Sequence, residues 1–240
     1  SMSQYLDIDR LEAIDPSEFR ARSPYPWANP DNLLTAEGYR ALLENMPDVS
    51  QFTREFGKER KAKQAPHDRY SLEYAEGMEV PGPWQDFIDE LRGDRYRAAI
   101  GRLFDAKNPE FRFHWHYAPP SCSVSPHCDA KREFGAHIWY FNSEEEWNPE
   151  WGGDTLVLDD GGRFQPDSAP AFEDFDQVIT CRSTGNWSAI IERSERGWHG
   201  VREITCPEGL MRKVFIVVVN PSSLYWRVRD GLKGKQIQRL

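Results

Sequence analysis

The spacing of apolar residues changes at Pro109. Up to that point apolar side chains recur at helical spacing, and beyond it they alternate with polar ones almost to the end of the chain. Alternation predicts strands, because successive side chains of a strand point to opposite faces. Gly, Pro and Asp turns divide this part into short strands, expected at 110–118, 134–142, 154–159, 177–182, 187–193, 198–204 and 212–220. Many short strands favour a sandwich or barrel, of which the double-stranded β-helix, or jelly roll, is one form.

The part before Pro109 is predicted to be mainly helical and irregular. Thr35 can cap a helix that continues to about Met46, and a second helical region extends from Trp84 to Asp105. Because helices precede the strands rather than alternate with them, a parallel α/β sheet is disfavoured. We therefore predict a mainly β fold with N-terminal helices, in which a jelly roll is covered by helices on one face.

The length of 240 residues suits a single domain. Within it we expect a helical and loop part at 1–108, a jelly-roll catalytic core at 109–220 and a C-terminal tail at 221–240. No apolar run is long enough to span a bilayer and the start of the chain is charged, so we expect neither a membrane partner nor a signal peptide. Four Cys without C-x-x-C spacing indicate reduced thiols and a cytoplasmic protein. The net charge of −9 disfavours nucleic acid as a partner.

A His-x-Asp pair lies just past the midpoint of the chain, at His127 and Asp129, and a further candidate ligand, His199, follows in the strand region. Two imidazoles and one carboxylate can occupy one face of an octahedral ion and leave three positions open for a cosubstrate and O₂, as is typical of non-heme Fe(II) oxygenases. The same three side chains could also hold zinc, with water as the fourth ligand. The motif alone therefore leaves the metal and the reaction open.

Strand alternation sorts the neighbouring residues into faces. In the predicted strand 110–118, the odd positions form an apolar row that ends in Tyr117. His114 and His116 point to the other side, and we interpret them as structural or surface residues rather than metal ligands.

Arg212 begins another apolar row, in the predicted strand 212–220, where a charge needs an anionic partner. Its guanidinium is a planar fork that suits a carboxylate. Lys213 points to the opposite face of this strand, and Arg202, three residues after His199, points away from the face of that histidine. Of these three residues, Arg212 is the one that alternation places at the head of an apolar row, so we expect it to have a buried anionic partner.

Six features follow one another in order between about residues 110 and 220. They are Tyr117, ten residues before His127; the His127-x-Asp129 pair; Ile138-Trp139-Tyr140-Phe141-Asn142; Trp151-Gly152-Gly153-Asp154-Thr155-Leu156; His199-Gly200-Val201; and Arg212. Together they resemble the prolyl-4-hydroxylase-like branch of the Fe(II)/2-oxoglutarate-dependent dioxygenases. The N-terminal part of the chain carries no such likeness.

The resemblance implies a site and a set of cofactors. The implied Fe(II) ligands are His127, Asp129 and His199. Arg212 would bind the C5 carboxylate of 2-oxoglutarate, with Tyr140 beside it and Tyr117 near the cosubstrate. The other implied reactant is O₂, and ascorbate would stimulate turnover. One departure is the interval of thirteen residues between the distal His and Arg212, a few more than is usual, which a longer turn at 206–209 would absorb.

The implied reaction is the hydroxylation of an unactivated C–H bond with release of succinate and CO₂. Related halogenases have Gly or Ala in place of the carboxylate, so Asp129 favours hydroxylation. Cys128, between the two ligands, is expected to point away from the metal because of strand alternation.

The substrate is the least constrained feature. A basic stretch from Arg54 to Arg69 is either a solvated loop or a lid that holds an acidic group of a substrate, and it leads us to favour a small carboxylate-bearing molecule. A protein or peptide prolyl hydroxylase is the alternative within the superfamily. Outside it, the alternatives are a zinc or cupin-type metal-binding jelly roll and a non-catalytic binding module. The sequence does not indicate an oligomeric state.

Overall fold

The computed structural model describes residues 4–222. Apart from its first two residues, the predicted C-terminal tail at 221–240 lies outside this range. No helix in the described part of the chain is long and apolar enough to cross a membrane.

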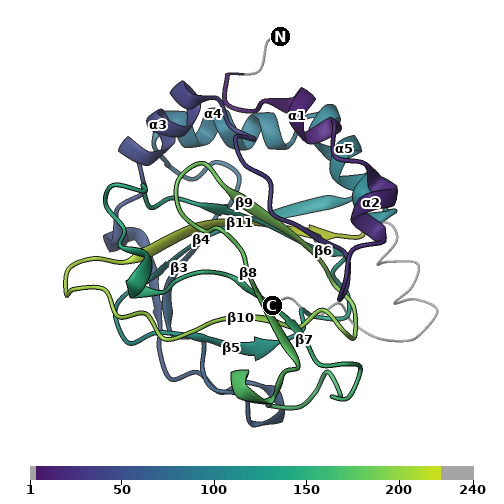
Figure 1. The fold of residues 1–240 in the computed structure, drawn as a ribbon. Helices are drawn as coiled ribbons and strands as arrows, with labels where there is room; N and C mark the ends of the chain where they lie inside the picture. The colour runs from purple at the N-terminus through teal and green to yellow at the C-terminus, as the bar shows by residue number, and fades with distance from the viewer. Residues whose placement is uncertain (1–3, 223–240) are drawn as a thin grey trace, which may run out of the picture.

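Two antiparallel sheets face each other (Figure 1). The larger sheet has the strand order β1-β9-β6-β11-β4-β3-β2 and the smaller one has the order β5-β10-β7-β8. Their bounds are Trp27–Ala28 (β1), Thr53–Glu55 (β2), Arg69–Glu73 (β3), Glu110–Ala118 (β4), Val124–His127 (β5), Gly135–Tyr140 (β6), Leu156–Asp159 (β7), Gln177–Thr180 (β8), Ser188–Glu192 (β9), His199–Val201 (β10) and Arg212–Asn220 (β11). This arrangement confirms the predicted jelly roll.

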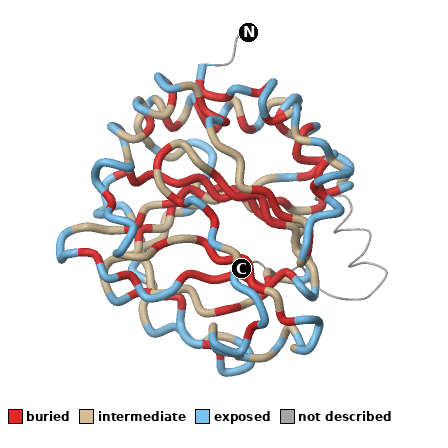
Figure 2. The backbone as a smooth tube through the Cα atoms, viewed as in Figure 1, coloured by how far each residue is buried: buried red, intermediate tan, exposed pale blue. Residues whose placement is uncertain are grey.

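The larger sheet is buried on both of its faces. On β11, Phe215 and Val217 pack into the core beneath the helices, whereas Val214 packs into a second core against β7 of the smaller sheet. Figure 2 shows this sheet as an almost continuous band of buried backbone through the middle of the molecule. Because both faces are buried, hydrophobicity alone does not tell which face of β4 or β11 belongs to the interior of the jelly roll.

Helices lie against the outer face of the larger sheet (Figure 1). They are Ile8–Glu12 (α1), Pro16–Arg20 (α2), Ala36–Glu44 (α3), Gly82–Leu91 (α4) and Asp94–Phe104 (α5), and the short 3₁₀ helices are Val49–Gln51, Lys61–Lys63, Pro149–Trp151 and Phe172–Asp174. On α4, the Trp84 ring lies 4.9 Å from that of Phe215, and the Phe87 ring lies 5.4 Å from that of Trp139. Thr35 caps α3, accepting a hydrogen bond from the Gly38 N–H at 3.0 Å.

Four strands are absent from the sequence prediction. Three of them, β1, β2 and β3, fall within residues 1–108 and extend the edges of the larger sheet. The fourth, β5, is only four residues long and contains Pro126, which obscures the alternation. β2 and β3 could not be recognised locally because they are charged and become strands through pairing, β3 with β4 and β2 with β3.

Candidate metal centre

Two adjacent strands of the smaller sheet bring the predicted ligands together. His127 ends β5, His199 begins β10, and the two residues are direct partners in the strand register. Asp129 follows two residues after His127. One ligand atom from each of the three side chains lies within 4.8 Å of the others, and the three are largely buried.

Hydrogen bonds to the backbone fix both imidazoles. His127 Nδ1 lies 2.9 Å from the Ser125 carbonyl oxygen, and His199 Nδ1 lies 2.9 Å from the Gly197 carbonyl oxygen. Since a carbonyl can only accept, each Nδ1 carries the proton, and in the neutral ring each Nε2 then offers a lone pair. Metal-binding histidines are held by bonds of this kind.

Asp129 completes a group of three electron-pair donors. Its Oδ1 lies 3.6 Å from His127 Nε2 and 3.3 Å from His199 Nε2, while its buried Oδ2 has no hydrogen-bond partner. Burial opposes ionisation, but the His199 and His127 rings hold the pKa of Asp129 below its usual range. Burial, followed by the charge of His199, lowers the pKa of His127. Two lone pairs and a carboxylate facing one another fit a cation between them.

Three ligands form this group, and no fourth His, Cys or carboxylate joins it among residues 4–222. Cys128 is turned away into a separate apolar cluster with Leu156, Leu158 and Trp198. A metal held by three protein ligands keeps positions open for other molecules, whereas structural zinc sites are closed by four.

Arg212 lies at the start of β11 on the inward face. Its Nε donates to the Gly153 carbonyl oxygen, and its Nη2 lies 3.4 Å from Thr155 Oγ1. Tyr140 donates to the same Thr155 oxygen at 2.6 Å, and its ring centroid is 5.9 Å from the guanidinium carbon. Arg212 is 8% exposed, and no carboxylate of the described residues lies within ion-pair distance of it. A buried guanidinium without a counter-ion fits an anionic ligand.

Gly153 allows this arginine to sit where it does. Its φ of +91° is a conformation that favours glycine, and a Cβ there would lie 3.3 Å from Arg212 Cδ. The Trp-Gly-Gly-Asp-Thr segment therefore provides both space and a carbonyl acceptor for the guanidinium.

The two other basic residues compared with Arg212 as anion-binding residues, Lys213 and Arg202, lie elsewhere. The Lys213 ammonium is 5.2 Å from the ring centroid of Tyr117, on the helix side of the sheet. Arg202 follows the end of β10, is exposed, and lies over the ring of Phe172. The residues between Val201 and Arg212 form an irregular segment, which accommodates the long interval seen in the sequence.

Tyr117 does not reach the inward face, which corrects the prediction for this residue. It pairs with Lys213 in the register and packs in the helix-side core, where its hydroxyl donates to the Pro47 carbonyl oxygen at 2.8 Å. The apolar row that ends in Tyr117 faces the helices, so the opposite face of β4 is the interior one.

His114 and His116 lie on that interior face. His116 is opposite Val214 and His114 is opposite Ile216, both of which pack between the sheets. Burial lowers the pKa of His114 to about 4, and burial followed by the charge of Arg69 lowers the pKa of His116. They are therefore neutral interior residues on the side of Arg212, not surface residues, although neither belongs to the group of metal ligands.

We expect Tyr117→Phe to leave the affinity for a dicarboxylate bound at Arg212 unchanged while lowering the free energy of unfolding by about 1 kcal/mol, since it removes one buried hydrogen bond. Tyr140→Phe should weaken that binding, because the hydroxyl next to Arg212 is lost. Titration calorimetry with a dicarboxylate and urea denaturation of both variants test this pair of expectations. An equal loss of affinity in the two variants would place Tyr117 at the anion site after all.

A strap of residues 56–68, which joins β2 to β3, lies beside the metal ligands. His67 brings its ring centroid to 4.7 Å from that of His127. The Ser125 hydroxyl donates its one proton to the Ala65 carbonyl oxygen at 3.3 Å. Toward His67 the Ser125 oxygen can therefore only accept, so His67 Nε2–H donates to Ser125 Oγ at 3.1 Å. No sequence motif marks His67; the only signal is its place within the basic stretch.

Comparison with known proteins gives matches to solved structures. No family model matches the chain, and no curated protein matches it. A prolyl-4-hydroxylase of Pseudomonas putida has 17% identity and a TM-score of 0.61, over 89% of this chain and 100% of that one. The fold is that of the 2-oxoglutarate-dependent oxygenases.

Two further structures extend this likeness. A prolyl hydroxylase of Trichoplax adhaerens, in complex with a peptide fragment of hypoxia inducible factor, has 10% identity and a TM-score of 0.63, over 95% of this chain and 94% of that one. A non-heme alpha-ketoglutarate-dependent carbocyclase from nogalamycin biosynthesis has 12% identity and a TM-score of 0.58, over 88% of this chain and 86% of that one. The resemblance expected from the motifs is thus confirmed at the level of the fold.

Proposed function

We propose that the protein is an Fe(II)- and 2-oxoglutarate-dependent dioxygenase that hydroxylates an unactivated C–H bond of a small carboxylate-bearing molecule and releases succinate and CO₂. Two observations together carry this proposal. Asp129 Oδ2 is buried without a hydrogen-bond partner within a three-ligand group, and Arg212 is buried on the inward face with no carboxylate of the described residues within ion-pair distance. A metal ion and a dicarboxylate would satisfy both.

Different residues would bind the metal ion and the cosubstrate. His127, Asp129 and His199 would hold the ion, and the backbone carbonyls of Ser125 and Gly197 keep each Nε2 turned toward it. When bound, Fe(II) and 2-oxoglutarate supply the oxidative chemistry with O₂, while the protein supplies position and electrostatics.

The far carboxylate of 2-oxoglutarate would be bound by Arg212. Thr155 and Gly153 hold the guanidinium in place, and Tyr140 lies beside it. Such a desolvated arginine–carboxylate contact orients the cosubstrate, because the guanidinium fork can form two parallel hydrogen bonds. With Asp129 present as a third protein ligand, the site supports hydroxylation rather than halogenation.

Two substrate classes fit the structural neighbours, which include peptide-binding and biosynthetic enzymes. The strap beside the ligands favours a small molecule, because it narrows the approach to the triad from β5 and carries several basic residues. A peptide prolyl substrate is the second candidate, and the likeness to the two prolyl hydroxylases favours it.

A zinc-dependent hydrolase or cupin-type protein would also use three ligands. It would have no need of a buried arginine facing inward near the metal, and Arg212 therefore favours the oxygenase. The same residue argues against a purely structural jelly roll, since an unpaired buried charge is costly without a function.

Succinate formation tests the proposal directly. We expect the purified protein, given Fe(II), 2-oxoglutarate, ascorbate and O₂, to form succinate, and a metabolite library to contain acids that accelerate it. Proline-containing peptides serve as the second arm, and protein loaded with Zn(II) is the control. Absence of succinate above the Zn(II) control would rule out the dioxygenase, and stimulation by peptides alone would favour the second candidate.

A further inference from the structure

We propose that Arg60 and Arg69 form a second anion site, which binds the carboxylate of the primary substrate beside the metal ligands. This inference rests on the proposed function and names the part of that site that selects the substrate. It assigns the two arginines a role separate from that of Arg212.

Arg69 faces the interior of the jelly roll. On β3 it lies two residues from Ser71, which is the register partner of His116, so both β3 side chains share the inward face with that histidine. The electrostatic influence of Arg69 on the pKa of His116, second only to burial, agrees with this placement. Arg69 is thus two strands away from Arg212, on the same face.

Arg60 approaches from the strap. Its Nη2 lies 3.4 Å from Gln64 Oε1, and no carboxylate of the described residues lies within ion-pair distance of its guanidinium. Burial and then the charge of Arg69 lower the pKa of Arg60, whereas Asp129 raises it. Arg69 Nη1 donates to the carbonyl oxygen of His67, whose ring lies against that of His127. Both guanidinium groups are therefore bound to the short 64–67 segment of the strap, beside the metal ligands.

Both arginines have an unsatisfied donor. The Nε atoms of Arg60 and Arg69 are buried and have no hydrogen-bond partner. The other nitrogens of Arg69 have partners: Nη2 lies 3.1 Å from a carboxylate oxygen of Glu55, and Nη1 donates to the His67 carbonyl oxygen at 3.0 Å. Glu55 also forms an ion pair with Lys58, so its charge is divided between two cations. Two like charges with buried orphan donors are stabilised by an oxyanion that accepts from both.

Three of the other four basic residues of the stretch are engaged elsewhere, and the fourth, Lys63, lines a separate cavity. Arg54 lies over the ring of Phe56, Lys58 pairs with Glu55, and Lys61 pairs with Asp167 at 3.1 Å. The ammonium groups of both lysines are on exposed side chains. Arg60 and Arg69 thus point inward while the engaged charges point outward. In a uniformly solvated loop all of these charges would lie in solvent.

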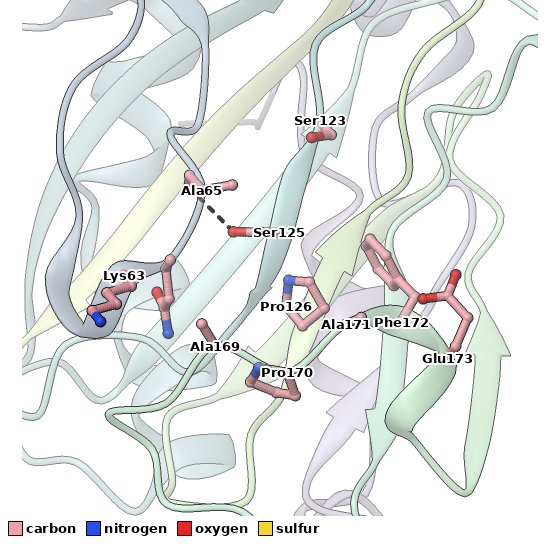
Figure 3. A pocket seen from close by; sticks show the side chains of 11 residues that line it. Lys63, Ala65, Ser123, Ser125, Pro126, Ala169, Pro170, Ala171, Phe172 and Glu173 are labelled. Atoms are coloured by element: carbon pink, nitrogen blue, oxygen red, sulfur yellow. Dashed lines mark hydrogen bonds between the residues drawn. The ribbon is translucent and has the colours of Figure 1, made fainter.

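A cavity lies next to the strap, and neither Arg60 nor Arg69 lines it. It has a volume of about 320 Å³ and lies between Lys63 and Ala65 on one side and Phe172 on the other, with Ser125 on β5 between them (Figure 3). The volume is at the small end of the range for ligand sites. None of the metal ligands lines it, and His67, bonded to Ser125, stands between the cavity and His127.

Polar contacts hold the strap in place. Gln64 Nε2 donates to the Ser168 carbonyl oxygen at 2.7 Å, and His67 donates to Ser125. These contacts fix the 64–67 segment, and with it the two guanidinium groups, beside the metal ligands.

Ligand-induced thermal stabilisation tests the site without relying on turnover. The probes are the twenty free amino acids and simple mono- and dicarboxylic acids, each paired with its carboxamide, added to protein loaded with Mn(II) and 2-oxoglutarate. An acid present at about ten times its Kd should raise the Tm of the wild-type protein by roughly 3–6 °C, and its amide should not. Arg60→Gln and Arg69→Gln should weaken the binding of that acid by about 30-fold or more.

Two further variants make the result interpretable. Lys61→Gln, which removes an outward charge that pairs with Asp167 rather than with Glu55, should bind the acid like the wild type, and Arg60→Lys should recover part of the affinity lost in Arg60→Gln. Equal stabilisation by acid and amide, undiminished binding by the two Gln variants, or no stabilisation by any acid would each overturn the inference. Succinate formation by the wild-type protein is measured separately, so failure of this site and failure of the dioxygenase proposal are distinguishable.

Discussion

Asp129→Ala is expected to reduce succinate formation to the level of the metal-free protein while leaving the fold intact. The side chain supplies the only carboxylate of the three-ligand group, and its Oδ2 has no other hydrogen-bond partner to satisfy it. Without it, two neutral imidazoles must hold the ion alone, so affinity for Fe(II) should fall together with activity. Iron content after dialysis, circular dichroism and succinate formation give three separate readouts.

Cys128→Ala is the matched control, because Cys128 lies between two ligands in sequence but packs into the apolar cluster behind them. It should retain iron and form succinate, with some loss of stability. His127→Ala and His199→Ala should behave like Asp129→Ala. A fully active Asp129→Ala protein would falsify the assignment of these three residues as the metal site.

Arg212→Ala should raise the KM for 2-oxoglutarate steeply. Removal of one partner from a desolvated charge pair typically costs about 2–5 kcal/mol, which corresponds to roughly a 30-fold or larger rise in KM. The effect should be near the upper end because Arg212 is buried and is held by Gly153 and Thr155. Initial rates of succinate formation as a function of 2-oxoglutarate concentration measure it.

Arg202→Ala is the control for this second prediction. Arg202 has the same chemistry and follows the distal His strand, but it is exposed over Phe172. Its removal should leave the KM for 2-oxoglutarate unchanged. The reverse outcome would be a KM for 2-oxoglutarate that rises in Arg202→Ala and is unchanged in Arg212→Ala. It would mean that the arginine that binds the cosubstrate lies on a different strand face from the one described.

Local patterns in the sequence determined most of the jelly-roll strands and grouped the three candidate metal ligands. Alternation marked β4, β6 and β11 nearly to the residue, because long paired strands with regular apolar rows carry a strong two-residue period. The His-x-Asp pair and His199 could be grouped because their spacing and order match a known arrangement. Alternation also separated Arg212 from Lys213 correctly, since neighbouring side chains of a strand must point to opposite faces.

Tertiary structure alone decided which face of β4 is the interior one. The row of Phe113, Trp115 and Tyr117 is the more apolar, yet it packs under the helices, and the row containing His114 and His116 faces the site. Period-two alternation divides a strand into two faces without saying which neighbour covers each. Because the larger sheet is buried on both sides, the apolar face could not be equated with the inside of the jelly roll.

Local sequence patterns also could not predict the short strands β2, β3 and β5 or the position of the strap. β5 carries the candidate metal ligand His127 but is only four residues long, and β2 and β3 are charged segments that become strands by pairing at a sheet edge. The basic stretch could be read from the sequence, but not the direction of each charge. The pairing of β3 with β4 turns Arg69 inward, and the packing of the strap buries Arg60 and leaves Lys58 in solvent. Long-range contacts, not residue type, decide which charges lose their water.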